Sequence, residues 1–138
     1  MKPSFYALDR GGWRDYVSLL HLPYTVWHLS YVVVGGCLAA EVAWGRLGLT
    51  VLAFFLAMGI GAHALDELAG RPLGTAIPPS ILVVLALVSI IAACAIGVVV
   101  AVDFSLWILP LITIGAFLVP AYNLELSEWK RPSNSSRL

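Results

Sequence analysis

The sequence predicts an all-α membrane protein, a bundle of four transmembrane helices preceded by a short N-terminal interfacial helix. Three observations predict it: of the 138 residues 60% are hydrophobic, only 12% are charged, and the mean hydropathy is +0.91. A soluble domain carries about 25% charged residues. A soluble domain of this size also has too little interior to hide so many apolar side chains. The bilayer is therefore the expected solvent, and intrinsic disorder is excluded.

Four apolar stretches are long enough to cross a bilayer, since about 20 residues of helix span ~30 Å of hydrocarbon. The expected spans run from about Leu22 to Ala40, from Leu47 to about Leu65, from Pro79 to Val102, and from Phe104 to about Leu124. Proline suits the first position of the third span, and a tight turn is expected near Asp103. The chain then divides into an N-terminal segment (1–21), the bundle (22–126) and a polar cytoplasmic tail (127–138).

The basic residues gather on one side of this arrangement. With four spans, the two termini and the loop from Asp66 to Pro78 share a side that holds Lys2, Arg10, Arg14, Arg71, Lys130, Arg131 and Arg137. Only Arg46 lies on the other side. The positive-inside rule therefore places both termini and the central loop in the cytoplasm. The formal net charge is zero, which leaves no basic surface for nucleic acid.

The segment before the first span lacks the apolar core of a signal peptide and is predicted to form an amphipathic helix on the cytoplasmic surface. Its apolar residues recur at helical spacing: Trp13, Tyr16, Val17 and Leu20. A helix that simply leads into the first span is an equal alternative. His21 and His28, seven residues apart, are expected on one face of that span as packing or anchoring groups.

One polar cluster stands out at the cytoplasmic end of the second span, where residues 61–79 read GAHALDELAGRPLGTAIPP. If the helix continues, His63, Asp66 and Glu67 share one face, and Arg71 follows Glu67 by four residues. The pair Arg71-Pro72 then ends the helix. Carboxylates suit Mg²⁺, which binds through one or two of them plus substrate phosphates. Asp66 and Glu67 are the candidate ligands, with His63 a weaker one, and Arg71 suits a phosphate.

A structural interpretation of the same residues stays open. Charges near headgroup level cost little, so Glu67 and Arg71 are also interpreted as an ordinary interfacial salt bridge. Tyr122 and Asn123 close the fourth span on the same side, where they suit hydrogen bonds to a polar ligand. Small residues four apart in the spans, such as Ala93 and Gly97, are expected to let helices pack closely.

Three segments carry a family resemblance. They are YVSLLHLPYTVWHLSYVVVGG, GAHALDELAGRPLGTAIP and FLVPAYNLEL, which together extend over roughly residues 13 to 126. In this order they resemble the lead-in and first helix, the first aspartate-rich motif, and the end of the fourth helix of the UbiA-type intramembrane prenyltransferases. The chain is similar to the N-terminal half of a 4-hydroxybenzoate polyprenyltransferase-like protein.

This resemblance implies a site within the membrane where Mg²⁺ holds the diphosphate of a polyprenyl donor and the prenyl group passes to an acceptor. It makes Asp66 the Mg²⁺–diphosphate ligand, Glu67 its helper, Arg71 a diphosphate contact and Tyr122 a pocket residue. Full members of the family have a second aspartate-rich motif in their other half. Transfer is therefore expected only when a homodimer or a complementary half-protein completes the site.

Two other functions remain alternatives. The first is a non-catalytic four-helix membrane protein, either truncated or a scaffold. The second is a small oligomeric transporter, which ranks last because such a protein needs an ionisable group near the middle of the membrane. All expected spans lack one, since every formal charge falls near a helix end.

Overall fold

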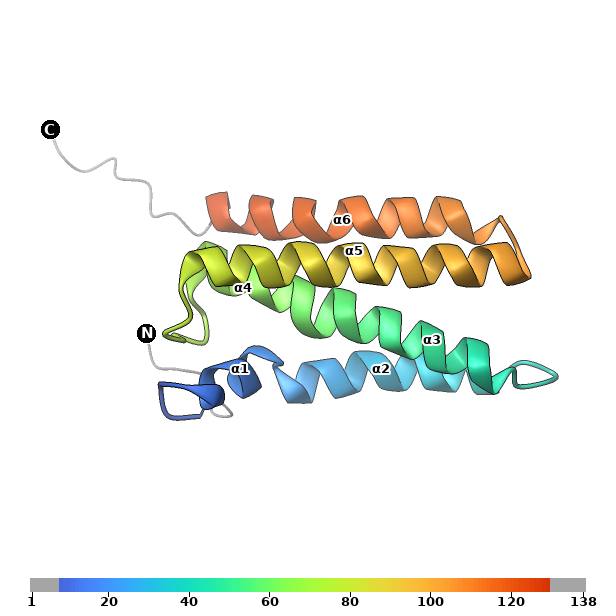
Figure 1. Cartoon of the computed structure of the whole chain (residues 1–138), viewed down its shortest axis with the longest axis horizontal. Coiled ribbons are helices and arrows are strands. Elements are labelled where there is room, and N and C mark those ends of the chain that lie inside the picture. Colours follow the sequence, from blue (N-terminus) through green and yellow to red (C-terminus); the bar gives the residue numbers. More distant parts are fainter. Residues whose placement is uncertain (1–7, 130–138) are drawn as a thin grey trace, which may run out of the picture.

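The computed structural model describes residues 8–129, with side chains as far as Tyr122, and its regular structure in that part is helical throughout. The elements are α1 (Trp13–Leu19), α2 (Leu22–Cys37), α3 (Trp44–Phe54), the π-helix η1 (Phe55–Ala62), α4 (His63–Gly70), α5 (Pro79–Phe104) and α6 (Ile108–Trp129). The long helices lie lengthwise beside one another, with α5 next to α6 on one side and next to α3 and α4 on the other (Figure 1). The predicted all-α class is confirmed.

In the described part of the chain, two helices are long and apolar enough to cross a membrane. One is Trp44–Gly70, in which α3, η1 and α4 run on without a break, and the other is α5. The 26 residues of α5 extend ~39 Å at ~1.5 Å per residue, more than the ~30 Å of hydrocarbon. Helices α1 and α2 make a third candidate if they are counted as one bent span. The apolar part of α6, Ile108–Tyr122, is shorter than these.

The N-terminal helix is separate from the helix that follows it. The two meet at an angle of 44°, and His21 between them takes a left-handed backbone conformation with φ 49°. Helix α1 buries Asp15 and Ser18 against the protein, whereas Trp13 and Tyr16 are exposed. The face of α1 that contacts the rest of the chain thus combines these polar groups with Leu19 of the hydrophobic core, and the two aromatic side chains are exposed.

The π-helix in the middle of the long helix lies where two other helices come close. A Cβ atom on Gly59 would lie 2.9 Å from Thr25 Cγ2 of α2, and one on Gly61 would lie 2.8 Å from Ile90 Cγ1 of α5. Both distances are shorter than Cβ contacts in proteins, so a side chain at either position would force its neighbour to shift. Helix η1 is thus held between α2 and α5 at van der Waals contact.

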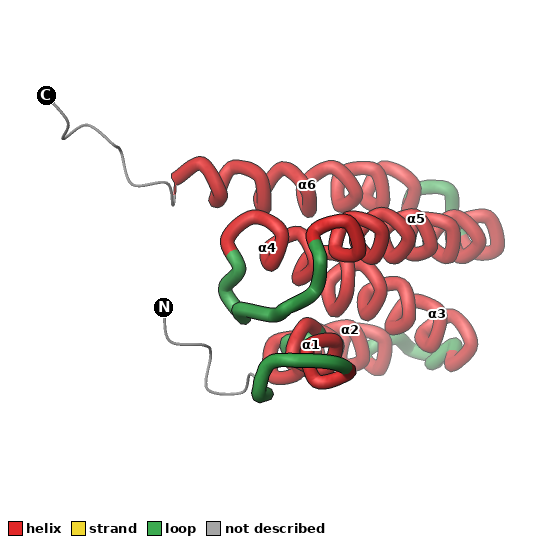
Figure 2. The backbone as a smooth tube through the Cα atoms, turned by 60° about the vertical axis from the view of Figure 1, so that its left-hand side comes forward, coloured by secondary structure: helices red, strands yellow, loops and turns green. Residues whose placement is uncertain are grey.

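Helix α4 ends and α5 begins where the sequence predicts, but the turn after α5 lies elsewhere. Arg71 follows α4 in a left-handed conformation with φ 49°, and the loop 71–78 then leads to Pro79 at the start of α5. At the far end, α5 continues past Asp103 to Phe104, so the turn lies at Ser105–Trp107, two to four residues later than predicted. Figure 2 shows the α4–α5 loop arching beside α1, at one end of the bundle.

Candidate functional site

The carboxylate of Glu67, on α4, accepts the hydrogen bonds that organise the α4–α5 loop. Its side chain is 0% exposed, and both carboxylate oxygens accept hydrogen bonds from the loop. Leu73 N donates to Oε2 at 2.9 Å, and Thr75 donates to Oε1 from its backbone N at 2.7 Å and from its Oγ1 at 2.8 Å. A buried carboxylate without such partners would be very costly. Glu67 therefore holds the loop in its conformation.

Arg71 braces the same loop from its outer side. Its Nη1 donates to Ile77 O at 2.8 Å and to Thr75 O at 3.3 Å. The same nitrogen lies 4.0 Å from Glu67 Oε1, and the Arg71 side chain is 36% exposed. The predicted pairing of Glu67 with Arg71 is thus present as an ion pair at the distance limit. The closer partners of Arg71 are carbonyl oxygens, which its left-handed backbone brings within reach.

The N-terminal segment completes the site, a connection that the sequence pattern does not reveal. Asp15, 4% exposed, accepts a hydrogen bond from Ala76 N at 3.0 Å on Oδ2 and one from Gly11 N at 3.2 Å on Oδ1. Arg10 Nη2 donates to Thr75 O at 3.4 Å. Two buried carboxylates, Asp15 and Glu67, therefore hold the loop from opposite sides. The one feature of the sequence that could have indicated this contact is an acidic residue, Asp15, in a helix whose other face is aromatic.

His63 has a neighbour that its sequence position does not predict. The ring of His21 lies edge-on to that of His63 with centroids 4.6 Å apart, and it stacks on Tyr24 at 4.7 Å. His63 Nδ1 lies 3.1 Å from Gly59 O. His21 does not share a face of α2 with His28 as expected, because it precedes the helix in a left-handed conformation. The left-handed turn at His21 brings its ring to His63 on the neighbouring long helix.

The predicted magnesium ligands are close in the chain but differ in their surroundings. Both oxygens of Glu67 already accept hydrogen bonds, so Glu67 has no oxygen facing an open position. Asp66 is partly exposed and has an interaction of its own. Among residues 8–122, no three His, Cys, Asp or Glu side chains come together as a metal site. The oxygens of Glu67, as they are arranged, therefore do not fit a magnesium ion.

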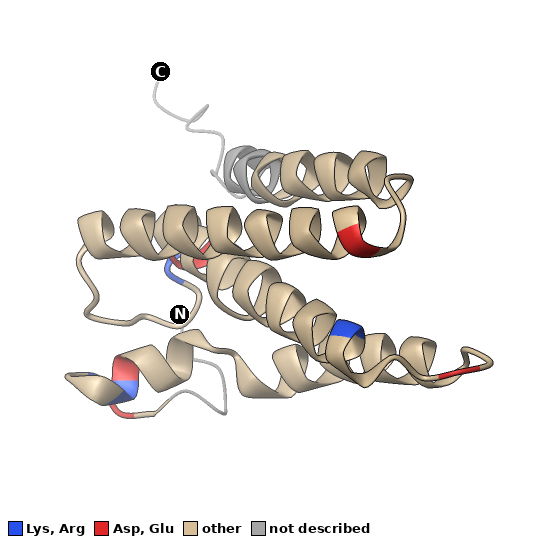
Figure 3. Ribbon diagram, turned by 45° about the vertical axis from the view of Figure 1, so that its right-hand side comes forward, with Lys and Arg blue, Asp and Glu red and all other residues tan. Residues whose placement is uncertain are grey.

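Of the residues predicted at the end of α6, only Tyr122 has a described side chain. Tyr122, the last residue whose side chain is described, is 66% exposed. Asn123 belongs to α6, but its side chain lies outside the described residues, as do Lys2 and residues 130–138 of the predicted tail. Figure 3 shows the charged residues at the two ends of the bundle, which matches the distribution expected from the sequence.

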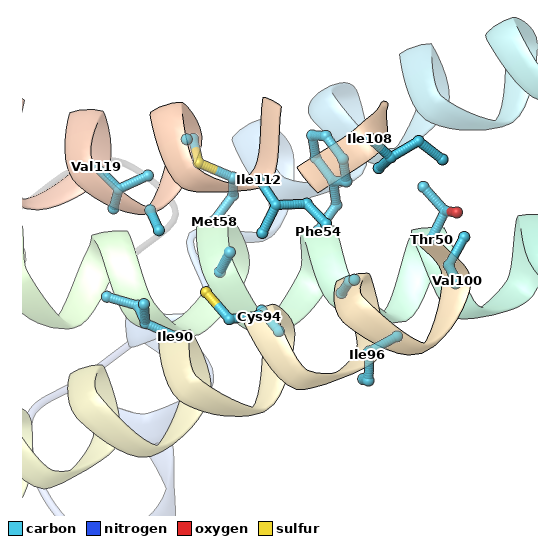
Figure 4. Close-up of a pocket in the computed structure, with 16 residues that line it drawn as sticks. Thr50, Phe54, Met58, Ile90, Cys94, Ile96, Val100, Ile108, Ile112 and Val119 are labelled. Atoms are coloured by element: carbon cyan, nitrogen blue, oxygen red, sulfur yellow. The ribbon is translucent and has the colours of Figure 1, made fainter. Parts of the chain in front are cut away.

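A second feature, the apolar slot, lies in the part of the bundle away from the α4–α5 loop. It is a cavity of about 360 Å³ between α3–η1, α5 and α6. It extends from Thr50, Val100 and Ile108 at one end to Met58, Ile90 and Val119 at the other (Figure 4). Its polar groups are few: Thr50 donates its hydroxyl to Arg46 O at 2.8 Å, and Cys94 contributes a free thiol. The slot therefore suits hydrocarbon and offers nothing to a charged headgroup.

Small residues from three helices give the slot its depth. They are Ala53 and Ala57 on the long helix, Ala93 and Gly97 on α5, and Gly115 and Ala116 on α6. A Cβ on Gly97 would lie 2.8 Å from Ile112 Cδ1, whereas one on Gly115 would meet nothing within 4 Å. The sequence interpretation assigned such small residues to helix packing. These small residues were the only features of the sequence that could have indicated the slot. Their spacing, however, is the same for a close helix contact and for a cavity.

Comparison with known proteins adds no assignment to this geometry. No protein-family model, no curated protein and no solved structure matches the chain.

Proposed function

We propose that this chain is a four-span integral membrane protein that binds a polyprenyl lipid, with the hydrocarbon chain in the apolar slot. The observation that carries the proposal is the slot itself, about 360 Å³ in volume and lined almost entirely by apolar side chains. Small-molecule sites typically measure ~300–1,000 Å³ and bury most of their ligand. Within a bilayer, the molecules that reach such a slot carry hydrocarbon chains.

The four spans of this proposal are α2, the continuous helix from Trp44 to Gly70, α5 and α6. The length and composition of Trp44–Gly70 and of α5 support two of them directly. The exposed apolar side chains of α2 and α6, among them Trp27, Val34, Leu111 and Phe117, favour a lipid environment for the other two. The positive-inside rule then gives a cytoplasmic α4–α5 loop and cytoplasmic termini.

A polyprenyl diphosphate is the ligand that joins the slot to the resemblance with UbiA-type prenyltransferases. Ile90, at the slot's end nearest the α4–α5 loop, is eleven residues beyond Pro79, which is ~16 Å along α5. A long chain with its phosphate group near the loop has the reach to fill the slot, whereas a short one does not. Transfer of the prenyl group to an acceptor is proposed only for an assembly with a second copy or a complementary half-protein.

A non-catalytic role is the second candidate, and one observation favours it. Glu67 and Asp15 are both buried and accept backbone N–H groups of the same loop. Carboxylates in this arrangement stabilise the chain's own fold. A membrane protein that holds a polyprenyl lipid for another protein needs the slot and the loop, but no chemistry at Glu67.

The experiment compares two glycine variants that differ in whether they fill the slot. Gly115 lines the slot and Gly35 does not, and a Cβ at either position meets nothing within 4 Å. The purified variants Gly115→Leu and Gly35→Leu are loaded with a polyprenyl diphosphate in detergent, and the retained lipid is measured by mass spectrometry. Loss of at least tenfold in Gly115→Leu, with Gly35→Leu unchanged, supports the proposal. Equal retention by both variants contradicts it.

A further inference from the structure

Two arginines from distant parts of the chain meet at one carbonyl oxygen. Arg10 Nη2 and Arg71 Nη1 contact Thr75 O at 3.4 Å and 3.3 Å. Two guanidinium groups at one acceptor repel each other, so the arrangement must be held by other contacts. Asp15 supplies one through Ala76 N, and Glu67 supplies others through Leu73 N and Thr75 N.

The described carboxylates at this end of the bundle each have an interaction within the chain, including Asp66, which is partly exposed. Asp15 and Glu67 are buried and accept backbone N–H groups. The carboxylate of Asp9 pairs with the guanidinium of Arg14 at 3.8 Å. Glu67 lies 4.0 Å from Arg71 Nη1, which balances part of one positive charge. Around the loop, the carboxylates of Asp15 and Glu67 are thus buried, whereas Arg10 is exposed and Arg71 is partly exposed.

Both arginines keep donors that face outward. Arg10 is exposed, and the Arg71 side chain is 36% exposed. A guanidinium carries five N–H donors in a rigid fork. Within residues 8–122, the hydrogen bonds of each arginine use a single terminal nitrogen. Two guanidinium forks side by side match the several oxygens of a phosphate or diphosphate.

We propose that Arg10 and Arg71 together form a phosphate-binding site on the α4–α5 loop, for the phosphate or diphosphate group of a lipid or of a soluble ester. The inference deepens the proposed function, on which the identity of the lipid rests, because it names the residues that hold the charged end of the ligand. Arg10 is the new element, since the resemblance to prenyltransferases concerns Arg71 alone. The site needs no occupied slot, so the two proposals fail separately.

The test uses the full chain, purified in detergent with EDTA present so that divalent cations contribute nothing. Binding of inorganic diphosphate is measured by calorimetry for the wild type, Arg10→Gln, Arg71→Gln and Arg14→Gln. Arg14 is the matched control because it has the same charge and lies at the same end, where it pairs with Asp9. Arg10→Gln and Arg71→Gln are each expected to weaken binding at least tenfold, and Arg14→Gln less than twofold. Arg10→Gln is the decisive variant, because Arg71→Gln also removes hydrogen bonds that hold the loop.

A second arm distinguishes the source of the phosphate. Wild type and Arg10→Gln are placed in nanodiscs of phosphatidylcholine with or without phosphatidic acid, and their thermal midpoints are compared. A rise of the midpoint with phosphatidic acid that Arg10→Gln abolishes assigns the site to a lipid phosphate, even if inorganic diphosphate binds weakly. The proposal is overturned if neither ligand responds to Arg10→Gln, or if Arg14→Gln has the same effect.

Discussion

Glu67 and Thr75 are joined twice, because one carboxylate oxygen, Oε1, accepts both the backbone N–H and the hydroxyl of Thr75, at 2.7 Å and 2.8 Å. This pair connects α4 to the loop that precedes α5. The carboxylate that the sequence marks as a candidate metal ligand therefore has a structural task in the fold. Removal of these hydrogen bonds is therefore expected to lower the free energy of unfolding.

Glu67→Gln is expected to lower the free energy of unfolding by about 1–3 kcal/mol. An amide nitrogen in place of one oxygen leaves a buried N–H of the loop without an acceptor, and such a group costs about that much. Thermal or denaturant unfolding in detergent measures the loss, with the exposed carboxylate variant Asp103→Asn as control. Thr75→Val removes only the hydroxyl contact and should cost ~1 kcal/mol. Equal stability of Glu67→Gln and Asp103→Asn would show that the bonds at Glu67 contribute nothing.

Magnesium is expected to act only together with a diphosphate. Because Glu67 already accepts hydrogen bonds from the loop, Mg²⁺ alone should leave the thermal midpoint unchanged. If Asp66 holds the ion through the ligand's phosphates, Mg²⁺ should increase retention of a polyprenyl diphosphate, and Asp66→Asn should remove the increase. A midpoint that rises with Mg²⁺ alone, and no longer does so in Glu67→Gln, would restore Glu67 as a metal ligand.

Gly59→Ala is expected to destabilise the bundle. The added Cβ would lie 2.9 Å from Thr25 Cγ2, and Thr25 cannot easily move because it is buried and its hydroxyl donates to Leu20 O at 2.6 Å. Overpacking of this kind costs about 1–3 kcal/mol, which exceeds the ~1 kcal/mol that alanine gains over glycine in a helix. Gly48→Ala is the control, since a Cβ there meets nothing within 4 Å. That variant should be stabilised, and a gain in both variants would refute the close contact at Gly59.

The proposed topology is testable with single cysteines in a background without Cys37 and Cys94. Ala76→Cys lies in the α4–α5 loop and Leu106→Cys in the α5–α6 turn, and both positions are exposed. With a cytoplasmic α4–α5 loop, a membrane-impermeant maleimide should label Leu106→Cys in intact cells and Ala76→Cys only after permeabilisation. The reverse pattern would show that the orientation is opposite to the proposed one. Labelling of both in intact cells would place both positions outside and would show that α5 does not cross the membrane.

Much of the fold follows from local sequence signals. Apolar runs predicted the long helices, and Pro79 marked the start of α5. Arg71-Pro72 predicted the end of α4, where the structure has the left-handed Arg71. The helix boundaries shifted by a few residues because composition changes more gradually than backbone conformation does. The four-span arrangement itself stays a prediction, supported directly for two helices and for a third if α1 and α2 count as one.

The candidate site was predicted only in part because its geometry depends on contacts between distant segments. Glu67 and Arg71 are four residues apart, so helical spacing was enough to pair them. Asp15 bonds Ala76 across 61 residues, and His21 reaches His63 through a left-handed turn. No periodicity in one sequence encodes such contacts. The slot could not be predicted for the same reason. Small residues at helical spacing line a cavity or a close contact depending on the neighbouring helix.

The central claim is that a prenyl chain occupies the apolar slot, and photocrosslinking tests it most directly. A polyprenyl diphosphate with a diazirine in its chain is bound to the purified protein, irradiated, and the labelled residues are identified by mass spectrometry. The account predicts labels on Met58, Cys94 and Val119, which face one another across the slot (Figure 4). Excess unlabelled lipid and Gly115→Leu should both remove those labels. Labels confined to exposed outer residues such as Val34 and Phe117, unchanged in Gly115→Leu, would contradict the account.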